Sequence, residues 1–405
     1  MTDPIAILRD PATIRQRSHA ILALGEAGLL AHFTVDLARL PECSAYVAGV
    51  MRDNYPDLKI PYHARWRHFA AGGRDRWGAL AQALRVDAAE MARIRFDLCV
   101  ISVLLDAGAG AAWRYVEPGT GDVVARSEGL AVASLHAFAA GLFSSDPANP
   151  LRCDAAKLAA ITADDLAVAF QVTADNPLAG LDGRARLLRS LGEALARRAD
   201  LFNTPGRIGK LADWLMAQAQ GGAVPAAAIL ASVLDGLGSI WPDRLMLDGQ
   251  SLGDVWRHSA IVTGDATTGL IPFHKLSQWL SYSLVEVLED AGLRVSELDA
   301  LTGLPEYRNG GLFLDLGVIA LRDPAQAGRV HQVWDELVVE WRALTVALLD
   351  GLAHPVRALL GRTAEDLPLA CILEGGSWAA GRKIAAVRRP GGPPPLTVVS
   401  DGTVF

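Results

Sequence analysis

The feature that most constrains the fold is an apolar repeat at three- and four-residue steps between positions 276 and 288. The repeating side chains are Leu276, Trp279, Leu280, Leu284, Val287 and Leu288. Apolar residues at these steps line one face of an α-helix, because the helix turns once roughly every 3.6 residues. The segment Asp290-Ala291-Gly292 follows, and a glycine directly after the last turn is a common helix end. The sequence therefore predicts a helix that begins in the run Pro272 to Trp279 and ends near Gly292.

The composition predicts that most of the remaining chain is helical as well. Of 405 residues, 51% are hydrophobic, 20% are charged and 6% are aromatic, and alanine and leucine dominate. Both of these residues favour helices. A chain of this length and composition can bury a sizeable core, so we expect one compact domain over residues 1–405. The expected fold class is mainly α.

Three short segments depart from the helical pattern. Residues 113–126 surround a glycine-rich turn and predict a small β-hairpin. Residues 369–373 and 396–399 are short apolar runs typical of strands, and Ser377 between them can cap a helix. We therefore expect a C-terminal strand element within an α/β appendage over residues 366–405.

Charge and cysteine usage exclude several classes of protein. The formal net charge is −7, from 38 Lys and Arg against 45 Asp and Glu. This balance argues against general binding of nucleic acid, because a duplex binder needs a basic stripe. The four cysteines are scattered, without the spacing of a zinc site or a disulfide framework. No leader opens the chain, and no apolar run approaches the roughly 20 residues that span a bilayer. We expect a soluble cytoplasmic protein that binds neither nucleic acid nor membrane.

Sequence motifs for cofactors and metals are missing. There is no Walker loop, no dinucleotide glycine fingerprint and no convincing phosphoribosyltransferase loop. His63 and His68 are the closest histidine pair, and no carboxylate pattern accompanies them. We therefore expect metal-independent chemistry without a cofactor. The sequence leaves the oligomeric state open, a homo-oligomer included.

The helix predicted from position 275 carries a second, polar face. Lys275, Gln278 and Tyr282 repeat at the same steps, so their polar tips project together. Further along, Glu306 follows a proline, and a helix start would hold this carboxylate ionised. A helix-turn-helix over residues 271–321 would bring Lys275 and Glu306 together as a catalytic pair. The alternative is a solvated helix surface and an ordinary acidic residue at a helix start.

Residues 60–77 interleave aromatic and basic side chains, with Trp66 between Arg65 and Arg67. Guanidinium groups bind phosphate bidentately, and aromatic rings stack on flat ligands. We expect a substrate-side loop that faces the same cleft as Lys275, in which the two arginines bind phosphate and Trp66 contacts the ligand. The alternative is a loop pinned by its aromatic residues, with the arginines turned outward.

Four motifs spread over nearly the whole chain carry a resemblance to a known family. They are Ile-Pro-Tyr-His-Ala-Arg-Trp-Arg-His-Phe (60–69), Leu-Thr-Gly-Leu-Pro-Glu-Tyr-Arg-Asn-Gly-Gly (301–311), Leu-Glu-Gly-Gly-Ser-Trp-Ala-Ala-Gly-Arg (373–382) and Ser-Asp-Gly-Thr-Val-Phe (400–405). On these motifs the chain resembles the uracil catabolism protein 4 family. A fainter similarity links Phe-His-Lys-Leu-Ser-Gln (273–278) and Thr-Gly-Leu-Pro-Glu-Tyr-Arg (302–308) to the queuosine salvage N-glycosidases. The second resemblance implies a helical fold distantly similar to DNA glycosylases.

Together the two resemblances imply an N-glycoside hydrolase of uracil catabolism, a branch of pyrimidine degradation. The implied substrate is a small nucleoside- or nucleotide-like molecule, ribosylurea or its 5′-phosphate, cleaved to urea and ribose or ribose phosphate. The queuosine glycosidases have an aspartate where this chain has Glu306. Glu306 would stabilise the oxocarbenium-like transition state or align water, and Lys275 would orient Glu306 or bind the sugar or phosphate.

Side chains near this pair are the candidates for substrate contact and for acid assistance to the leaving urea. They are His274, Gln278, Tyr282, Tyr307 and Arg308. The alternative function is a non-catalytic binding or assembly protein of the uracil pathway, because carboxylates at helix starts are common for capping reasons alone. A DNA-base glycosylase is disfavoured by the net charge of −7 and by the lack of a clear basic face.

Overall fold

A computed structural model describes residues 3–242 and 244–399, and 56% of the chain is helical. The strands are two or three residues long and pair into two-stranded sheets. Within the described residues no sheet closes on itself. The prediction of a mainly α fold is therefore confirmed.

The helices range from single turns to the long helix α16. They are α1 Pro4–Arg9, α2 Pro11–Glu26, α3 Leu40–Asn54, α4 Trp66–Phe69, α5 Arg76–Ala83, α6 Ala88–Leu104, α7 Arg126–Ala139, α8 Ala155–Ala160, α9 Ala163–Ala169, α10 Leu181–Arg197, α11 Ala199–Phe202, α12 Lys210–Gln218, α13 Ala226–Leu237, α14 Lys275–Asp290, α15 Tyr307–Asp315, α16 Glu336–Leu360, α17 Leu369–Ile372 and α18 Trp378–Arg388. A π-helical turn, Leu373–Ser377, joins α17 to α18.

The strand pairs connect loops rather than build layers. They are β1 Phe33–Val35 with β10 Ile319–Leu321, β2 Tyr115–Val116 with β3 Val123–Val124, β4 Ala223–Pro225 with β9 Arg294–Ser296, β5 Met246–Leu247 with β6 Gln250–Ser251, β7 Val255–Arg257 with β8 Leu270–Pro272, and β11 Val330–His331 with β12 Thr397–Val398. The predicted hairpin at residues 113–126 is confirmed as β2–β3, and the last predicted strand is confirmed as β12.

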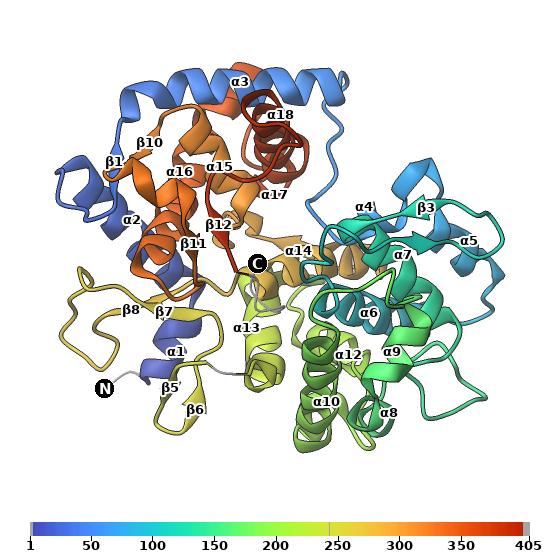
Figure 1. Ribbon diagram of the computed structural model, residues 1–405. Helices are drawn as coiled ribbons and strands as arrows, with labels where there is room; N and C mark the ends of the chain where they lie inside the picture. The colour runs from blue at the N-terminus through green and yellow to red at the C-terminus, as the bar shows by residue number, and fades with distance from the viewer. Residues whose placement is uncertain (1–2, 243, 400–405) are drawn as a thin grey trace.

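Helix α14 lies between two groups of elements (Figure 1). Figure 1 shows α4 to α12 gathered on one side of α14, and α2, α3, α15, α16 and α18 on the other. Helix α14 packs against α6 and α13, while α16 packs against α2 and α3. The apolar face predicted at positions 276–288 is buried in the main hydrophobic cluster, which contains residues from both groups. The core therefore passes from one group of elements to the other through α14.

The N-terminus of α14 is capped by a residue from another segment. The backbone N–H of Lys275 donates to Asp254 Oδ2 at 2.9 Å, and the N–H of Phe273 donates to the Asp254 carbonyl oxygen. Arg342 of α16 donates to both carboxylate oxygens of Asp254, at 2.8 and 2.7 Å. A carboxylate is favourable at a helix N-terminus, because it accepts from N–H groups that lack a partner within the helix. Asp254 thus fixes the start of α14 to α16.

The C-terminal segment corrects one prediction. Residues 369–373 form helix α17 and the start of the π turn, not a strand. They are buried on all sides, so their apolar run has no period that separates strand from helix. Ser377 is not an N-cap either, because its backbone is helical and its hydroxyl donates to Asn309 Oδ1 at 2.8 Å. Residues 400–405, which carry the fourth motif, lie outside the described residues.

Helix α16 is the one described helix that is long and apolar enough to cross a membrane, with a mean hydropathy of 1.4. This finding corrects the expectation that no such apolar run exists. Its most apolar window is 61% buried within the protein. Because α16 packs against α2, α3 and α15, its apolar character is that of a core helix.

Candidate functional site

Buried hydrogen bonds fasten the turn before α15 to helix α14. Gln278 donates through Nε2 to Thr302 Oγ1 at 2.7 Å and accepts through Oε1 from the Thr302 N–H at 2.8 Å. The Tyr282 hydroxyl donates to the Thr302 carbonyl at 3.0 Å. Both side chains are fully buried, so they hold the turn and are not free for the substrate contact that the sequence suggested. They fasten the turn that precedes Glu306 to α14.

Glu306 is the N-cap of α15. Its Oε2 accepts from the Arg308 N–H at 2.8 Å, and its Oε1 accepts from the Asn309 N–H at 2.5 Å. Burial raises the pKa of Glu306 above its ordinary value, although these two N–H groups and the charges of Lys275 and His63 lower it. From the sequence we expected the helix start to hold the carboxylate ionised. Instead, burial outweighs the helix start, and the pKa of Glu306 is raised.

Lys275 and Glu306 form a half-buried, opposed pair of charges. Burial lowers the pKa of Lys275, and the charge of Glu306 is the largest influence that raises it. Loss of solvent disfavours both charged forms, while the mutual attraction favours them. The pKa of each group therefore depends on the charge of the other.

Three residues that were predicted to contact the substrate instead form hydrogen bonds with other parts of the protein. His274 is buried, and its Nε2 lies 2.9 Å from the Leu8 carbonyl. Arg67 donates to Glu286 Oε2 at 2.6 Å. The Trp66 indole donates to the Ser283 carbonyl at 2.7 Å. These side chains anchor neighbouring segments and do not gather around Lys275 and Glu306.

Tyr307 and Arg308 flank the pair on α15. Tyr307 is 37% exposed and burial raises its pKa, with the charge of Glu306 adding to the effect. The Arg308 guanidinium lies 4.9 Å from the centre of the Tyr307 ring and donates to the Gly392 carbonyl at 2.8 Å. Tyr307 is therefore available at the rim of the site, whereas Arg308 ties α15 to the C-terminal segment.

An imidazole that the sequence reading did not place in the site lies beside two tryptophans. The His63 ring centre is 6.3 Å from that of Trp279 and 5.9 Å from that of Trp378. Its Nδ1 lies 2.6 Å from Oε2 of Glu374, which projects from the π turn. The imidazole therefore lies beside α14, the helix that begins at Lys275, and its charge lowers the pKa of Glu306.

Arg65 enters the site as a fully buried cation. It forms an ion pair with Asp106 at 3.0 Å and donates to Ser102 and Ser127. Its guanidinium lies 5.6 Å from the centre of the Trp279 ring on α14, and a cleft shared by its loop and Lys275 stays a prediction. Its binding of phosphate stays a prediction.

Three buried nitrogen atoms around Trp279 lack a hydrogen-bond partner within the described chain. They are Arg65 Nη2, His68 Nδ1 and Trp279 Nε1. The His68 ring meets the Trp279 ring edge-on at 5.7 Å, and burial together with Arg65 lowers the pKa of His68 to about 4. Unsatisfied buried polar atoms are rare in native proteins and call for an explanation, which a bound oxygen-rich ligand would supply.

The charge of Asp106 acts on several of these groups. It raises the pKa values of Lys275, His68 and Tyr307. The site therefore combines a carboxylate, a cation and imidazoles beside indole rings. Such a set can bind a polar ring and transfer protons during bond cleavage.

Some of the residues that sequence reasoning missed lie within the family motifs, and others lie in segments without any motif. His63, Glu374 and Trp378 lie within the motifs at 60–69 and 373–382, so those motifs marked them without giving them a role. Asp106 opens a run of small residues and Asp254 lies in a segment without periodicity, and neither pattern indicates a site.

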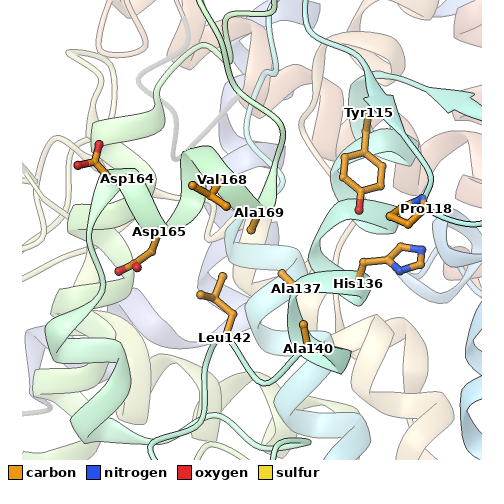
Figure 2. A pocket seen from close by; sticks show the side chains of 10 residues that line it. All are labelled: Tyr115, Pro118, His136, Ala137, Ala140, Leu142, Asp164, Asp165, Val168 and Ala169. Carbon is orange, nitrogen blue, oxygen red and sulfur yellow. The ribbon is translucent and has the colours of Figure 1, made fainter.

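A separate depression of about 630 Å³ lies between the β2–β3 hairpin, α7 and α9 (Figure 2). Figure 2 shows Tyr115 and His136 on one side, with Val168, the exposed Asp164 and the half-buried Asp165 on the other. His136 Nε2 lies 3.0 Å from Glu117 Oε1. None of its ten lining residues belongs to the group around Lys275 and Glu306.

The fold and the site define a class: helical proteins with a half-buried lysine and glutamate and an imidazole held by a carboxylate. The chain belongs to the family described as "Protein of unknown function (DUF1688)", which matches residues 7–405. It is 40% identical over 414 residues to "Protein urg3" of Schizosaccharomyces pombe, with 100% of both chains covered. It is 36% identical over 438 residues to "Uracil catabolism protein 4" of Lachancea kluyveri, covering 100% of this chain and 99% of the relative. The resemblance to the uracil catabolism protein 4 family is confirmed.

Proposed function

We propose that this protein is an N-glycoside hydrolase of uracil catabolism that cleaves ribosylurea, or its 5′-phosphate, to urea and ribose or ribose phosphate. A role in this pathway is supported by the relative named "Uracil catabolism protein 4". The observation that carries the proposed reaction is that Lys275 and Glu306, both half-buried, act on each other's pKa, with the His63 ring 6.3 Å from that of Trp279 on α14. The similarity of segments 273–278 and 302–308 to N-glycosidase motifs supports the same reaction.

The chemistry requires a negative charge next to the sugar. As the C1′–N bond breaks, positive charge develops on C1′ and the ring oxygen, and a fixed carboxylate in a water-poor site stabilises that charge strongly. Glu306 supplies the carboxylate and accepts a proton from the attacking water. Burial raises the pKa of Glu306, which makes it a better base than an exposed carboxylate, and the charge of Lys275 favours the ionised form.

The surrounding groups suit a ribosylurea. The indole rings of Trp279 and Trp378 form apolar walls for the sugar, and Tyr307 lies at the rim. The unpartnered donors Arg65 Nη2 and Trp279 Nε1 require acceptors, which the ureido carbonyl or a phosphate would provide. Leaving such donors without acceptors in a buried site is unfavourable, so ligand binding gains from satisfying them.

The second candidate is a binding or assembly protein of the same pathway. It is favoured by the hydrogen bonds of Glu306, because each carboxylate oxygen already accepts from a backbone N–H of α15. A capping carboxylate needs no catalytic role to be explained.

Incubation of the purified protein with ribosylurea and with its 5′-phosphate separates the two functions. The hydrolase releases urea from at least one of them in repeated turnovers, measured as free urea against time. A binding protein instead gives saturable binding by calorimetry without urea release. Binding without turnover under all conditions would contradict the proposed hydrolase.

A further inference from the structure

The π turn Leu373–Ser377 gives Glu374 an unusual setting. Such turns widen a helix by one residue and occur frequently at functional sites. Here the turn is packed closely, because a Cβ on Gly375 would lie 2.9 Å from Ile60 and one on Gly376 would lie 2.8 Å from Met51. The close packing fixes the backbone from which Glu374 reaches His63.

His63 is oriented by contacts on several sides. Its backbone N–H donates to the Ala370 carbonyl at 3.0 Å, its ring lies near Trp279 and Trp378, and its Nδ1 lies 2.6 Å from Glu374 Oε2. A carboxylate at Nδ1 fixes the tautomer and the orientation of the ring. Nε2 forms no hydrogen bond among the described residues, so it is the nitrogen left to serve a ligand.

We propose that His63, held by Glu374, is the general acid that protonates the leaving nitrogen. This inference rests on the proposed N-glycoside hydrolysis. As the C1′–N bond breaks, its electron pair goes to the ureido nitrogen, which takes the proton from His63 Nε2. Water adds its oxygen to C1′ and gives its proton to Glu306. Solvent then returns a proton to His63 and removes one from Glu306, so the enzyme is restored and urea leaves neutral.

The neighbouring donors are less suited to this step. His68 faces the Arg65 cation, and its pKa of about 4 leaves it neutral near neutral pH. The pKa of Tyr307 is raised, so it gives up its proton reluctantly. Among these groups, His63 has a carboxylate directly at its ring, and Glu374 acts on the substrate only through this histidine, as a positioning residue.

A pair of substrates with different leaving groups tests the proposal. Urea needs a proton to leave, whereas 4-nitrophenolate leaves without one, so 4-nitrophenyl β-D-ribofuranoside and its 5-phosphate do not need the acid. His63→Gln should lower urea release at least about a hundredfold while nitrophenolate release falls by less than about threefold. Glu374→Gln should show the same selectivity with a smaller loss, about tenfold, which keeps the test informative if His63→Gln does not fold.

The matched control is His136→Gln, which removes another histidine paired with a glutamate, in the depression of Figure 2. It should leave both rates unchanged. Equal losses on the two substrates in His63→Gln and Glu374→Gln would overturn the assignment of the acid and leave the proposed hydrolysis standing. A wild-type protein that releases no urea would contradict the proposed function, and the acid assignment with it.

Discussion

Glu306 serves two purposes that compete for the same oxygen atoms. As the N-cap of α15 it accepts hydrogen bonds from two backbone N–H groups. As the partner of Lys275 its charge raises the pKa of the lysine. The N–H groups and Lys275 lower its pKa, while burial raises it. The ionisation of this one side chain is therefore set by its neighbours and can be changed without touching it.

Replacing Lys275 with methionine should move the acid side of the pH profile of kcat/KM to higher pH. The Lys275 charge lowers the pKa of Glu306, so its loss lets Glu306 keep its proton up to a higher pH. Because the carboxylate is the active form in our proposal, activity would then appear only at higher pH. Lys275→Arg retains the charge and is the control. An acid limb that does not move in Lys275→Met would show that the two groups are not coupled.

At the scale of elements, the site depends on close approach between α15 and α18. A Cβ on Gly381 of α18 would lie 2.2 Å from the carbonyl oxygen of Arg308, well inside any normal contact. Helix α15 begins directly after Glu306, and the π turn that bears Glu374 leads directly into α18. The glycine thus explains part of the motif at 373–382: it allows two helices that carry site residues to touch.

Gly381→Ala should destabilise the fold by about 1–3 kcal/mol, because the overlap is with backbone that must shift. The control is Gly183→Ala in α10, where a Cβ meets nothing within 4 Å. There alanine should stabilise the helix by up to about 1 kcal/mol. Denaturant unfolding measures both changes, and a neutral Gly381→Ala would refute the close approach.

For the whole molecule, α14 is the element on which both groups of helices and the site depend. Residues of the site come from stretches at 63–68, 106, 275–279, 306–307 and 374–378. The Asp254–Arg342 ion pair, at 2.7 Å and with Arg342 fully buried, links the start of α14 to α16. Breaking this ion pair should therefore lower the stability of the whole fold.

Asp254→Ala is expected to lower the free energy of unfolding by about 3–5 kcal/mol, because it leaves the buried Arg342 charge without this carboxylate and uncaps α14. The control is Asp122→Ala, which breaks an exposed ion pair with Arg74 and should cost less than about 1 kcal/mol. Guanidinium chloride unfolding compares the two. Similar small losses in both variants would contradict a structural role for the buried pair.

The sequence predicted the features that depend on local pattern. The periodicity at 276–288 identified α14, which spans Lys275–Asp290, and the glycine-rich turn identified the β2–β3 hairpin. The apolar run at 369–373 was expected to be a strand but forms α17 and the start of the π turn, because a fully buried run has no period that separates strand from helix.

The features that could not be predicted depend on pairing between distant positions. His63 and Glu374 are 311 residues apart in sequence, and Lys275 is capped by Asp254 across a segment without periodicity. No local propensity encodes such contacts, because they arise only when the helices pack. Lys275 and Glu306 could be considered together from the sequence because their segments lie close along the chain, and their role as a catalytic pair stays a prediction.

The most direct test of the proposed hydrolysis compares urea release from ribosylurea 5′-phosphate by wild type, Glu306→Asp and Glu306→Asn. Aspartate and asparagine are both good N-caps, so the two variants preserve the start of α15 and differ in charge. If the Glu306 carboxylate stabilises the transition state, Glu306→Asn loses about a hundredfold or more in kcat, roughly 3 kcal/mol of barrier, while Glu306→Asp retains substantially more activity. Equal kcat values for wild type and Glu306→Asn would remove this carboxylate from the mechanism.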